Sequence, residues 1–154
     1  MRTLNKIVLT LLTVFIVIQF IRPARNNSGQ VLQTDVTNTI HVPGNVLDIF
    51  QKACYDCHSN NTRYPWYVNV QPVAWMLASH IKNGKENLNF SEFGSYSPRK
   101  QANKLRAIAK TMDEGSMPLS SYTTMHAEGK LSKQSKDLVS GWALKARDSL
   151  LAKN

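Results

Sequence analysis

The stretch Cys54-Tyr55-Asp56-Cys57-His58 decides how this chain is interpreted, because it contains both cysteines of the sequence. Two thiols three residues apart, followed at once by an imidazole, form the C-x-x-C-H pattern that attaches a c-type haem. The thiols add to the haem vinyl groups, and the tether of fixed length holds the adjacent histidine at the iron. The pattern therefore predicts a covalently bound haem, with Cys54 and Cys57 as thioether anchors and His58 as the proximal ligand.

Three other chemistries could use the same cysteines. A dithiol redox pair would need a βαβ context, but the apolar residues before the motif recur at helical spacing. These residues are Val46, Ile49, Phe50 and Ala53. Structural zinc normally takes four ligands from two paired clusters, whereas the other histidines, His41, His80 and His126, are scattered singly. A structural disulfide would close a very short loop and gain little chain entropy, so the sequence favours haem attachment.

The charge of the chain is strongly positive, with a net charge of +9 over 154 residues. Its length and its 42% hydrophobic content indicate one domain with one core. A basic chain can bind nucleic acid, but the sequence contains no zinc finger, helix-turn-helix signature or RNP motif. We therefore expect no nucleic-acid partner, and we expect the positive surface to suit an acidic redox partner or anionic lipid.

Residues 1–25 are predicted to be a signal anchor or a signal peptide. Arg2 and Lys6 precede a stretch, residues 7–21, that is almost entirely apolar, which is the order of a charged n-region and an h-region. Arg22 stands where a cleavage site before Ala24 would need a small side chain. This favours an uncleaved single span in the cytoplasmic membrane, although the stretch is short for a bilayer that needs about twenty apolar residues.

The rest of the chain is predicted to be all-α, in the manner of a small mono-haem cytochrome c. Residues 26–44 are polar without periodicity and are expected to form a linker, and residues 45–154 the haem domain. Covalent haem attachment in bacteria takes place outside the cytoplasmic membrane, so this domain is expected on the periplasmic or outer face. The helical spacing predicts four helices, over residues 46–53 with Asn45 as N-cap, from Pro72 to Asn83-Gly84, from Ser97-Pro98 to Gly115, and from Leu131-Ser132 onward. Residues 88–96 are expected to be a packed loop.

A second ligand of the iron is predicted at Met117, which precedes Pro118 at the end of one helix and before the last. A Met thioether is a common distal ligand of a c-type haem. The proline fixes φ and keeps the loop from becoming helical. His80 and His126 remain alternative ligands, while Met112 and Met125 are poorer candidates because the first belongs to a core stripe.

Three residues after the motif are candidates for hydrogen bonds to a haem propionate. Arg63, Tyr64 and Trp66 follow a polar loop and belong to a run rich in aromatic side chains. Aromatic walls could also exclude water from the porphyrin, which raises the reduction potential. Ordinary core packing explains these aromatic residues equally well, so both interpretations stay open.

Taken together, these motifs resemble the haem-binding domain family of small bacterial proteins with a single C-x-x-C-H motif. The resemblance extends from about Val46 to Trp142. It rests on residues 54–60, Tyr64-Pro65-Trp66-Tyr67, Pro72-Val73-Ala74-Trp75, Gly84, Leu88-Asn89-Phe90-Ser91, Gly115-Ser116-Met117-Pro118, Tyr122, His126 and Leu131-Ser132. It implies a c-type haem domain with an exported N-terminus, similar in outline to class I cytochromes c. Ala127 departs from the pattern, which would have proline after His126.

The expected function is that of a membrane-tethered, mono-haem electron carrier with His/Met ligation of the iron. The alternative is a haem-based sensor or binding module, in which an open or weakly held distal site takes a small gas. No enzymatic activity is expected, and a peroxidase ranks third because the sequence has no other catalytic constellation.

Overall fold

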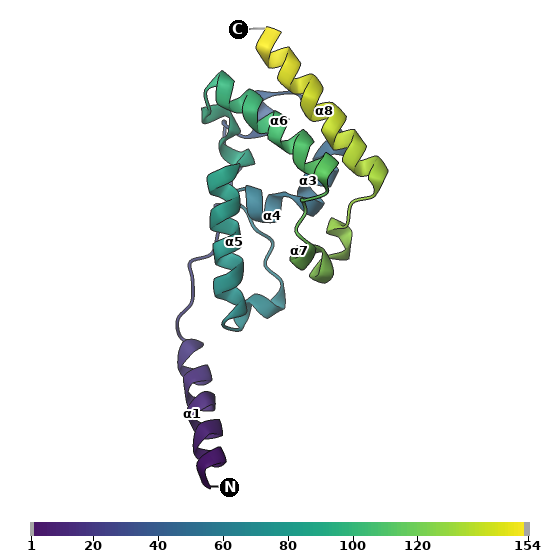
Figure 1. Ribbon diagram of the computed structural model, residues 1–154. Helices are drawn as coiled ribbons and strands as arrows, with labels where there is room; N and C mark the ends of the chain where they lie inside the picture. Colours follow the sequence, from purple (N-terminus) through teal and green to yellow (C-terminus); the bar gives the residue numbers. More distant parts are fainter. Residues whose placement is uncertain (1, 153–154) are drawn as a thin grey trace.

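The chain folds into an all-helical domain with one helix projecting from it (Figure 1). The structure is a computed structural model and describes residues 2–152. In chain order the helices are α1 (Arg2–Ile18), α2 (Val36–Thr39), α3 (Gly44–Ala53), α4 (Tyr55–His58), η1 (Trp66–Asn69), α5 (Val73–Asn87), η2 (Phe90–Ser95), α6 (Pro98–Glu114), α7 (Ser120–Met125), η3 (Ala127–Gly129) and α8 (Lys133–Ala152). Within the described residues the only β pairing is an isolated bridge between Asn27 and Asn61, so the predicted all-α class is confirmed there.

The core lies where α6 and α8 pack side by side against α3 (Figure 1). Phe50 of α3 stacks on Phe90 of η2 with 4.6 Å between ring centroids, and it meets the edge of Trp142 at 5.3 Å. Burying a large apolar side chain of this kind stabilises a fold by about 1.5–3 kcal/mol. Because α3 ends at Ala53, this aromatic cluster fixes the position at which the haem motif begins.

Three helix boundaries, the two ends of α6 and the start of α8, follow the sequence closely. Ser97 caps α6 by accepting a hydrogen bond from the Lys100 amide at 3.4 Å, and Pro98 occupies the first turn. The same helix ends at Gly115, whose φ of 65° lies in the left-handed region that glycine adopts freely. Ser132 accepts a hydrogen bond from the Ser135 amide at 3.1 Å just before α8. The predicted limits of these two helices are therefore confirmed.

Other local predictions are wrong for identifiable reasons. Helix α3 begins at Gly44, so Asn45 lies inside the helix and accepts only from the adjacent Val46 amide. Helix α5 does not stop at Gly84 but continues to Asn87. A Cβ on Gly84 would lie 2.5 Å from the carbonyl oxygen of Cys57, so this glycine serves close packing rather than helix termination. The expected loop at residues 88–96 contains the 3-10 helix η2.

The segment of residues 26–44, expected to be a linker, is packed against the domain. Val36 of α2 is fully buried at 0% exposure, and the Gly94 amide donates to the Thr34 carbonyl at 2.7 Å. Asn26 donates through Nδ2 to the carbonyl of Ser59 at 2.8 Å. The polar composition that suggested a linker therefore serves hydrogen bonds to the polar loop that follows the haem motif.

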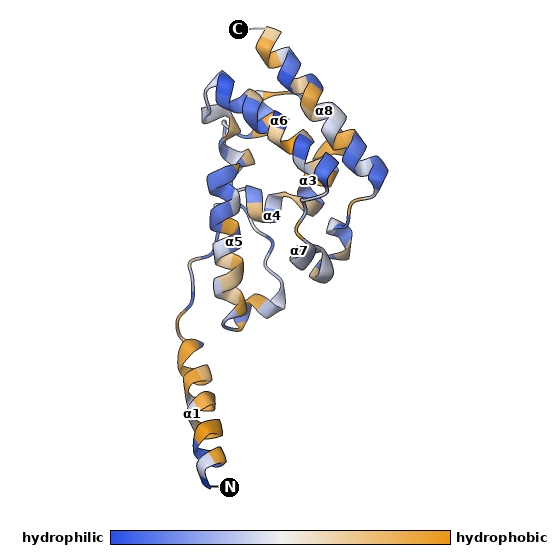
Figure 2. Ribbon diagram, in the orientation of Figure 1, coloured by the Kyte–Doolittle hydropathy of each residue, from blue (hydrophilic) through white to orange (hydrophobic). Residues whose placement is uncertain are grey.

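Helix α1 extends away from the domain and is strongly apolar along its length (Figure 2). Its C-terminal end is joined to the domain by Gln19, which accepts from the Gln71 amide at 2.9 Å. The Trp75 indole also donates to the carbonyl of Ile21 at 2.8 Å. Among residues 2–152, no helix has both the length and the apolar character needed to span a membrane.

Candidate haem site

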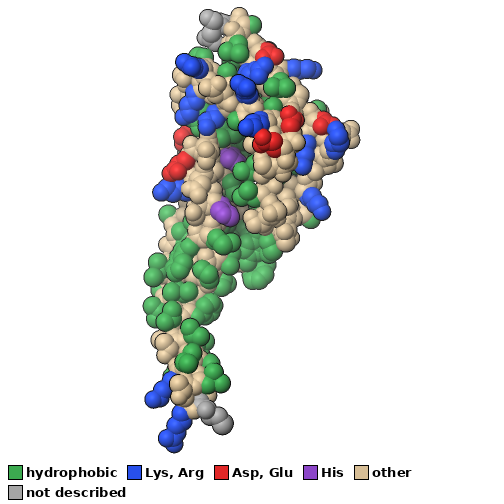
Figure 3. Space-filling model, in the orientation of Figure 1, with side chains coloured by type: hydrophobic (Ala, Val, Ile, Leu, Met, Phe, Trp, Pro, Cys, Tyr) green, Lys and Arg blue, Asp and Glu red, His purple; other side chains and the backbone are tan. Residues whose placement is uncertain are grey.

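A cavity with a volume of about 630 Å³ lies beside the cysteine motif. Its walls come from the end of α3, from α4, α5 and α6, and from the loop and short helix of residues 117–126. In the space-filling view, hydrophobic and histidine side chains lie next to each other at the surface beside α5 (Figure 3). Concave, mainly apolar cavities of this size are typical of cofactor sites.

The backbone of the motif forms a single helical turn. The amides of Cys57 and His58 both donate to the carbonyl of Cys54, at 3.2 and 2.9 Å. Gly84 of α5 supports this turn from outside, because its lack of a side chain lets α5 approach the Cys57 carbonyl. The turn places Cys54, Cys57 and His58 on the wall of the same cavity, as the motif predicts.

The imidazole of His58 is oriented by one backbone contact. Its Nδ1 lies 2.9 Å from the carbonyl oxygen of Leu88. Since a carbonyl can only accept, Nδ1 carries the hydrogen and Nε2 keeps its lone pair. Burial lowers the pKa of His58 below its ordinary value, which favours the neutral ring. A neutral imidazole held through Nδ1 is the arrangement that a metal-binding histidine needs.

The two thiols lie in an environment that keeps them protonated. Burial, with a contribution from Cys57, raises the pKa of Cys54 to about 12. Burial, with a contribution from Asp56, raises the pKa of Cys57 to about 11. Redox dithiols work through a lowered thiol pKa, so these values disfavour disulfide exchange. Neither thiol is oxidised, and both are free.

The structure offers no donor set for the zinc alternative in the part of the chain that it describes. Among residues 2–152, no group of three or more His, Cys, Asp and Glu side chains lies close enough to hold a metal ion directly. A structural zinc site would need four such ligands.

Asp56, between the two cysteines, anchors the motif in a way that the sequence did not reveal. Its side chain is 7% exposed, and Oδ1 accepts from the Arg63 amide at 3.0 Å and from Arg63 Nε at 3.1 Å. Oδ2 accepts from Arg63 Nη2 at 3.0 Å and from the Tyr122 hydroxyl at 2.7 Å. The C-x-x-C-H pattern allows any residue type at its two middle positions, so the pattern itself does not point to Asp56. The only signal in the sequence was the presence of a charged residue between the two cysteines.

All the predicted iron ligands reach the same cavity. Met117, His80 and His126 are half-buried and line it together with His58. His126 has other contacts, because its Nε2 lies 2.8 Å from the Tyr67 hydroxyl and its ring stacks on Tyr122 at 4.4 Å. These contacts favour a structural role for His126, while Met117 and His80 stay predicted ligands of the iron.

The three residues proposed to meet a propionate lie elsewhere. Among the described residues, the cavity wall does not include Arg63, Tyr64 or Trp66. Arg63 is paired with Asp56, and the hydroxyl of Tyr64 accepts from the Asn26 amide at 2.7 Å. Trp66 is 79% exposed. Their contact with a haem propionate remains a prediction, which these positions do not favour.

A helical domain with an apolar cavity, a protonated thiol pair and an oriented imidazole on one wall has the architecture of a haem protein. The family model described as "Haem-binding domain" matches the chain over residues 13–145. This chain therefore belongs to the haem-binding domain family and binds haem, and the resemblance seen in its motifs is confirmed. No curated protein and no solved structure matches the chain.

Proposed function

We propose that this protein is a mono-haem c-type cytochrome that carries electrons. The observation that carries the proposal is that Cys54, Cys57 and His58 share one wall of the cavity, with Nε2 of His58 left free by the bond from Nδ1 to Leu88. Met117 lines the same cavity and would supply the sixth ligand of the iron.

The attachment of the haem would use the two cysteines in their reduced form. Each S–H would add across one vinyl C=C, which would form one C–S bond and one C–H bond and would need no oxidant. The free, protonated state of Cys54 and Cys57 suits this addition. The hydrogen bonds of Asp56 would keep the loop between the two thioether bonds in one conformation.

Electron transfer is the role that the surroundings of the haem support best. Bound haem supplies one-electron chemistry between the ferric and ferrous states. With haem bound, the mainly apolar cavity wall would make the extra charge of the ferric state costlier, which would raise the reduction potential. Ligation by both His58 and Met117 would leave no open position for a substrate.

The same proposal includes the cellular location of the protein and the kind of redox partner that it meets. The apolar α1, which carries the basic residues Arg2 and Lys6 near its start, would tether the chain to the cytoplasmic membrane, with the haem domain on the periplasmic or outer face. The basic face of α6 suits an acidic redox partner. These statements rest on the apolar character of α1 and on the positive charge of the sequence.

Covalent attachment is tested by expressing the full chain with the haem-attachment machinery and extracting it with acid. Haem should stay with the wild-type chain on a denaturing gel and should be lost from the Cys54→Ala plus Cys57→Ala variant. Haem extracted from the wild type, or equal haem content in the double variant, would overturn the proposal.

The sixth ligand is tested with Met117→Ala, using Met125→Ala as the matched control because Met125 also lines the cavity. The sulfur-to-iron absorption band near the red edge of the visible spectrum should vanish only in Met117→Ala. If the band is unaffected by Met117→Ala, another ligand holds the iron.

A haem-based sensor is the second candidate, and one observation favours it. Helix α7, which directly follows Met117 and Pro118, contains no buried residue, so the distal side is held by few contacts. Rapid, stoichiometric binding of carbon monoxide to the reduced wild type at neutral pH would favour the sensor. Slow or absent binding favours the electron carrier.

A further inference from the structure

Lys104 differs from every other residue on the wall of the haem cavity. It lies on α6 and is half-buried, and among the described residues that line the cavity it is the only lysine or arginine. The mainly apolar cavity therefore has one fixed cationic group on its wall.

This cation has no anionic partner among residues 2–152. No ion pair there involves Lys104. Asp56 is the only acidic residue on the described cavity wall, and its carboxylate is already bound by Arg63 and Tyr122. A charge that is partly removed from water without a counter-ion costs free energy, so the lysine is suited to a ligand that carries an anion.

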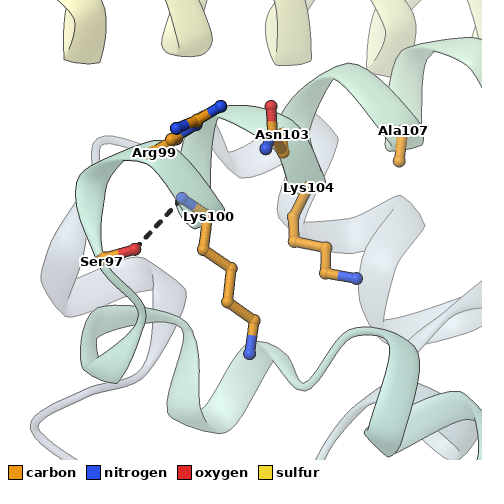
Figure 4. Close-up of a pocket in the computed structure, with 6 residues that line it drawn as sticks. All are labelled: Ser97, Arg99, Lys100, Asn103, Lys104 and Ala107. Carbon is orange, nitrogen blue, oxygen red and sulfur yellow. Dashed lines mark hydrogen bonds between the residues drawn. The ribbon is translucent and has the colours of Figure 1, made fainter.

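The position of Lys104 also fits an anionic edge of a ligand at the surface. A shallow hollow on α6 is lined by Ser97, Arg99, Lys100, Asn103, Lys104 and Ala107, of which Lys104 and Ala107 also line the haem cavity (Figure 4). The cavity thus meets the basic surface of α6 at Lys104. Lys100 leaves α6 on the same side, but its Nζ lies 3.9 Å from the centroid of the Tyr96 ring.

We propose that Lys104 binds a propionate carboxylate of the haem and so places the propionate edge at α6. The inference rests on the haem occupying this cavity. Haem is largely apolar apart from its carboxylates, and Lys104 is the one fixed cation available to them on the cavity wall of the described residues. The propionate edge would then lie toward the hollow on α6, and Lys104 takes the role that the sequence suggested for Arg63.

The first test measures the midpoint potential of the haem-loaded full chain from acidic to alkaline pH. The variants are Lys104→Gln, Lys104→Arg and the matched control Lys100→Gln. A cation disfavours the ferric state and lowers the pKa of a propionate. Lys104→Gln should therefore lower the potential and move its pH-dependent step to higher pH. Lys104→Arg keeps the positive charge, so its midpoint potential and the pH of its step should match those of the wild type. Lys100→Gln should change neither quantity.

The other titratable groups on the cavity wall are the same in all these variants, so a difference reports Lys104. They are Cys54, Asp56, Cys57, His58, Tyr67, His80, Tyr122 and His126. Equal pH profiles of Lys104→Gln and Lys100→Gln would overturn the proposal, as would a profile that Lys104→Arg fails to restore.

The second test does not depend on covalent attachment. Iron protoporphyrin IX and its dimethyl ester are titrated into the haem-free full chain carrying Cys54→Ala plus Cys57→Ala. The free acid should bind about fivefold more tightly than the ester, as expected for one partly exposed ion pair. Adding Lys104→Gln should remove this preference, and adding Lys100→Gln should keep it. A preference that survives Lys104→Gln would overturn the inference while leaving the proposed cytochrome function untouched.

Discussion

The two sides of the haem cavity differ in how firmly they are held. The proximal segment, residues 54–63, buries Asp56, Ser59 and Thr62, and its polar groups are bonded to the Leu88 carbonyl just after α5, to η2 and to residues 26–30. The distal segment, residues 115–129, exposes most of its side chains and buries only Gly129. The segment that contains the C-x-x-C-H motif is therefore held by many contacts with the rest of the fold, whereas the side that carries Met117 has few contacts of its own.

Tyr122 is the main connection between these two sides. Its hydroxyl donates to Asp56 Oδ2 at 2.7 Å, and its ring stacks on His126 of the distal segment. His126 in turn meets the hydroxyl of Tyr67 at 2.8 Å. The buried carboxylate of Asp56 thus holds the distal segment in place through Tyr122. A mutation of this contact should therefore loosen the distal segment without loosening the proximal one.

The largest expected effect is on the proximal side. Gly84→Ala should lower the free energy of unfolding by about 3 kcal/mol, because overpacking against a backbone group cannot relax easily. The new Cβ would lie 2.5 Å from the Cys57 carbonyl oxygen. Urea denaturation measures the change. The matched control is Gly141→Ala in α8, where no atom lies within 4 Å of an added Cβ and the helix should gain stability. Equal effects at both sites would contradict the close packing of α5 on the motif.

A smaller effect is expected from Asp56→Asn. This change weakens the charged hydrogen bonds to Arg63 and Tyr122 and should cost about 2 kcal/mol. The control is Asp48→Asn, whose exposed pair with Lys52 should contribute less than about 1 kcal/mol. Urea denaturation of both variants checks the difference. If Asp56→Asn is no more destabilising than Asp48→Asn, the buried carboxylate does not organise the motif.

Tyr122→Phe should separate the two sides at still lower cost. Loss of its hydroxyl removes the contacts with Asp56 and with the Lys52 carbonyl, which share one donated hydrogen, and should cost about 1 kcal/mol. Hydrogen exchange should increase in residues 118–129 and stay unchanged in residues 54–63, because the proximal segment keeps its bonds to the Leu88 carbonyl and to η2. An increase of equal size in both segments would show that the proximal side also depends on Tyr122.

The smallest effect is expected at Trp66. Its side chain is 79% exposed and lies outside the cavity, so Trp66→Ala should change the free energy of unfolding by less than about 0.5 kcal/mol. The midpoint potential should also match that of the wild type. A clear shift in potential would return Trp66 to the list of haem contacts that its sequence position suggested.

Much of the local structure could be predicted because it depends on short-range chemistry. Ser97, Pro98 and Gly115 delimit α6 through hydrogen bonds and backbone angles set within one turn. Predictions failed where a distant group determined the outcome. Gly84 was expected to end a helix, but the Cys57 carbonyl, far away in the sequence, requires a glycine inside α5. The polar stretch of residues 26–44 resembled a linker because its bonding partners in residues 59–62 and in η2 are equally remote.

The sequence alone predicted the all-helical class and the haem-binding domain family, and it named Cys54, Cys57 and His58 as the proposed residues of attachment, because a C-x-x-C-H loop contains its chemistry in five consecutive residues. Only the tertiary structure decided which side chains surround that loop. It paired Arg63 with Asp56, joined Tyr122 to the motif and brought Lys104 to the cavity wall. Arg63 lies only seven residues from Asp56. The contact of Tyr122 and the placement of Lys104, in contrast, join elements far apart in the chain, and they depend on how α6 and α7 pack, which no local pattern encodes.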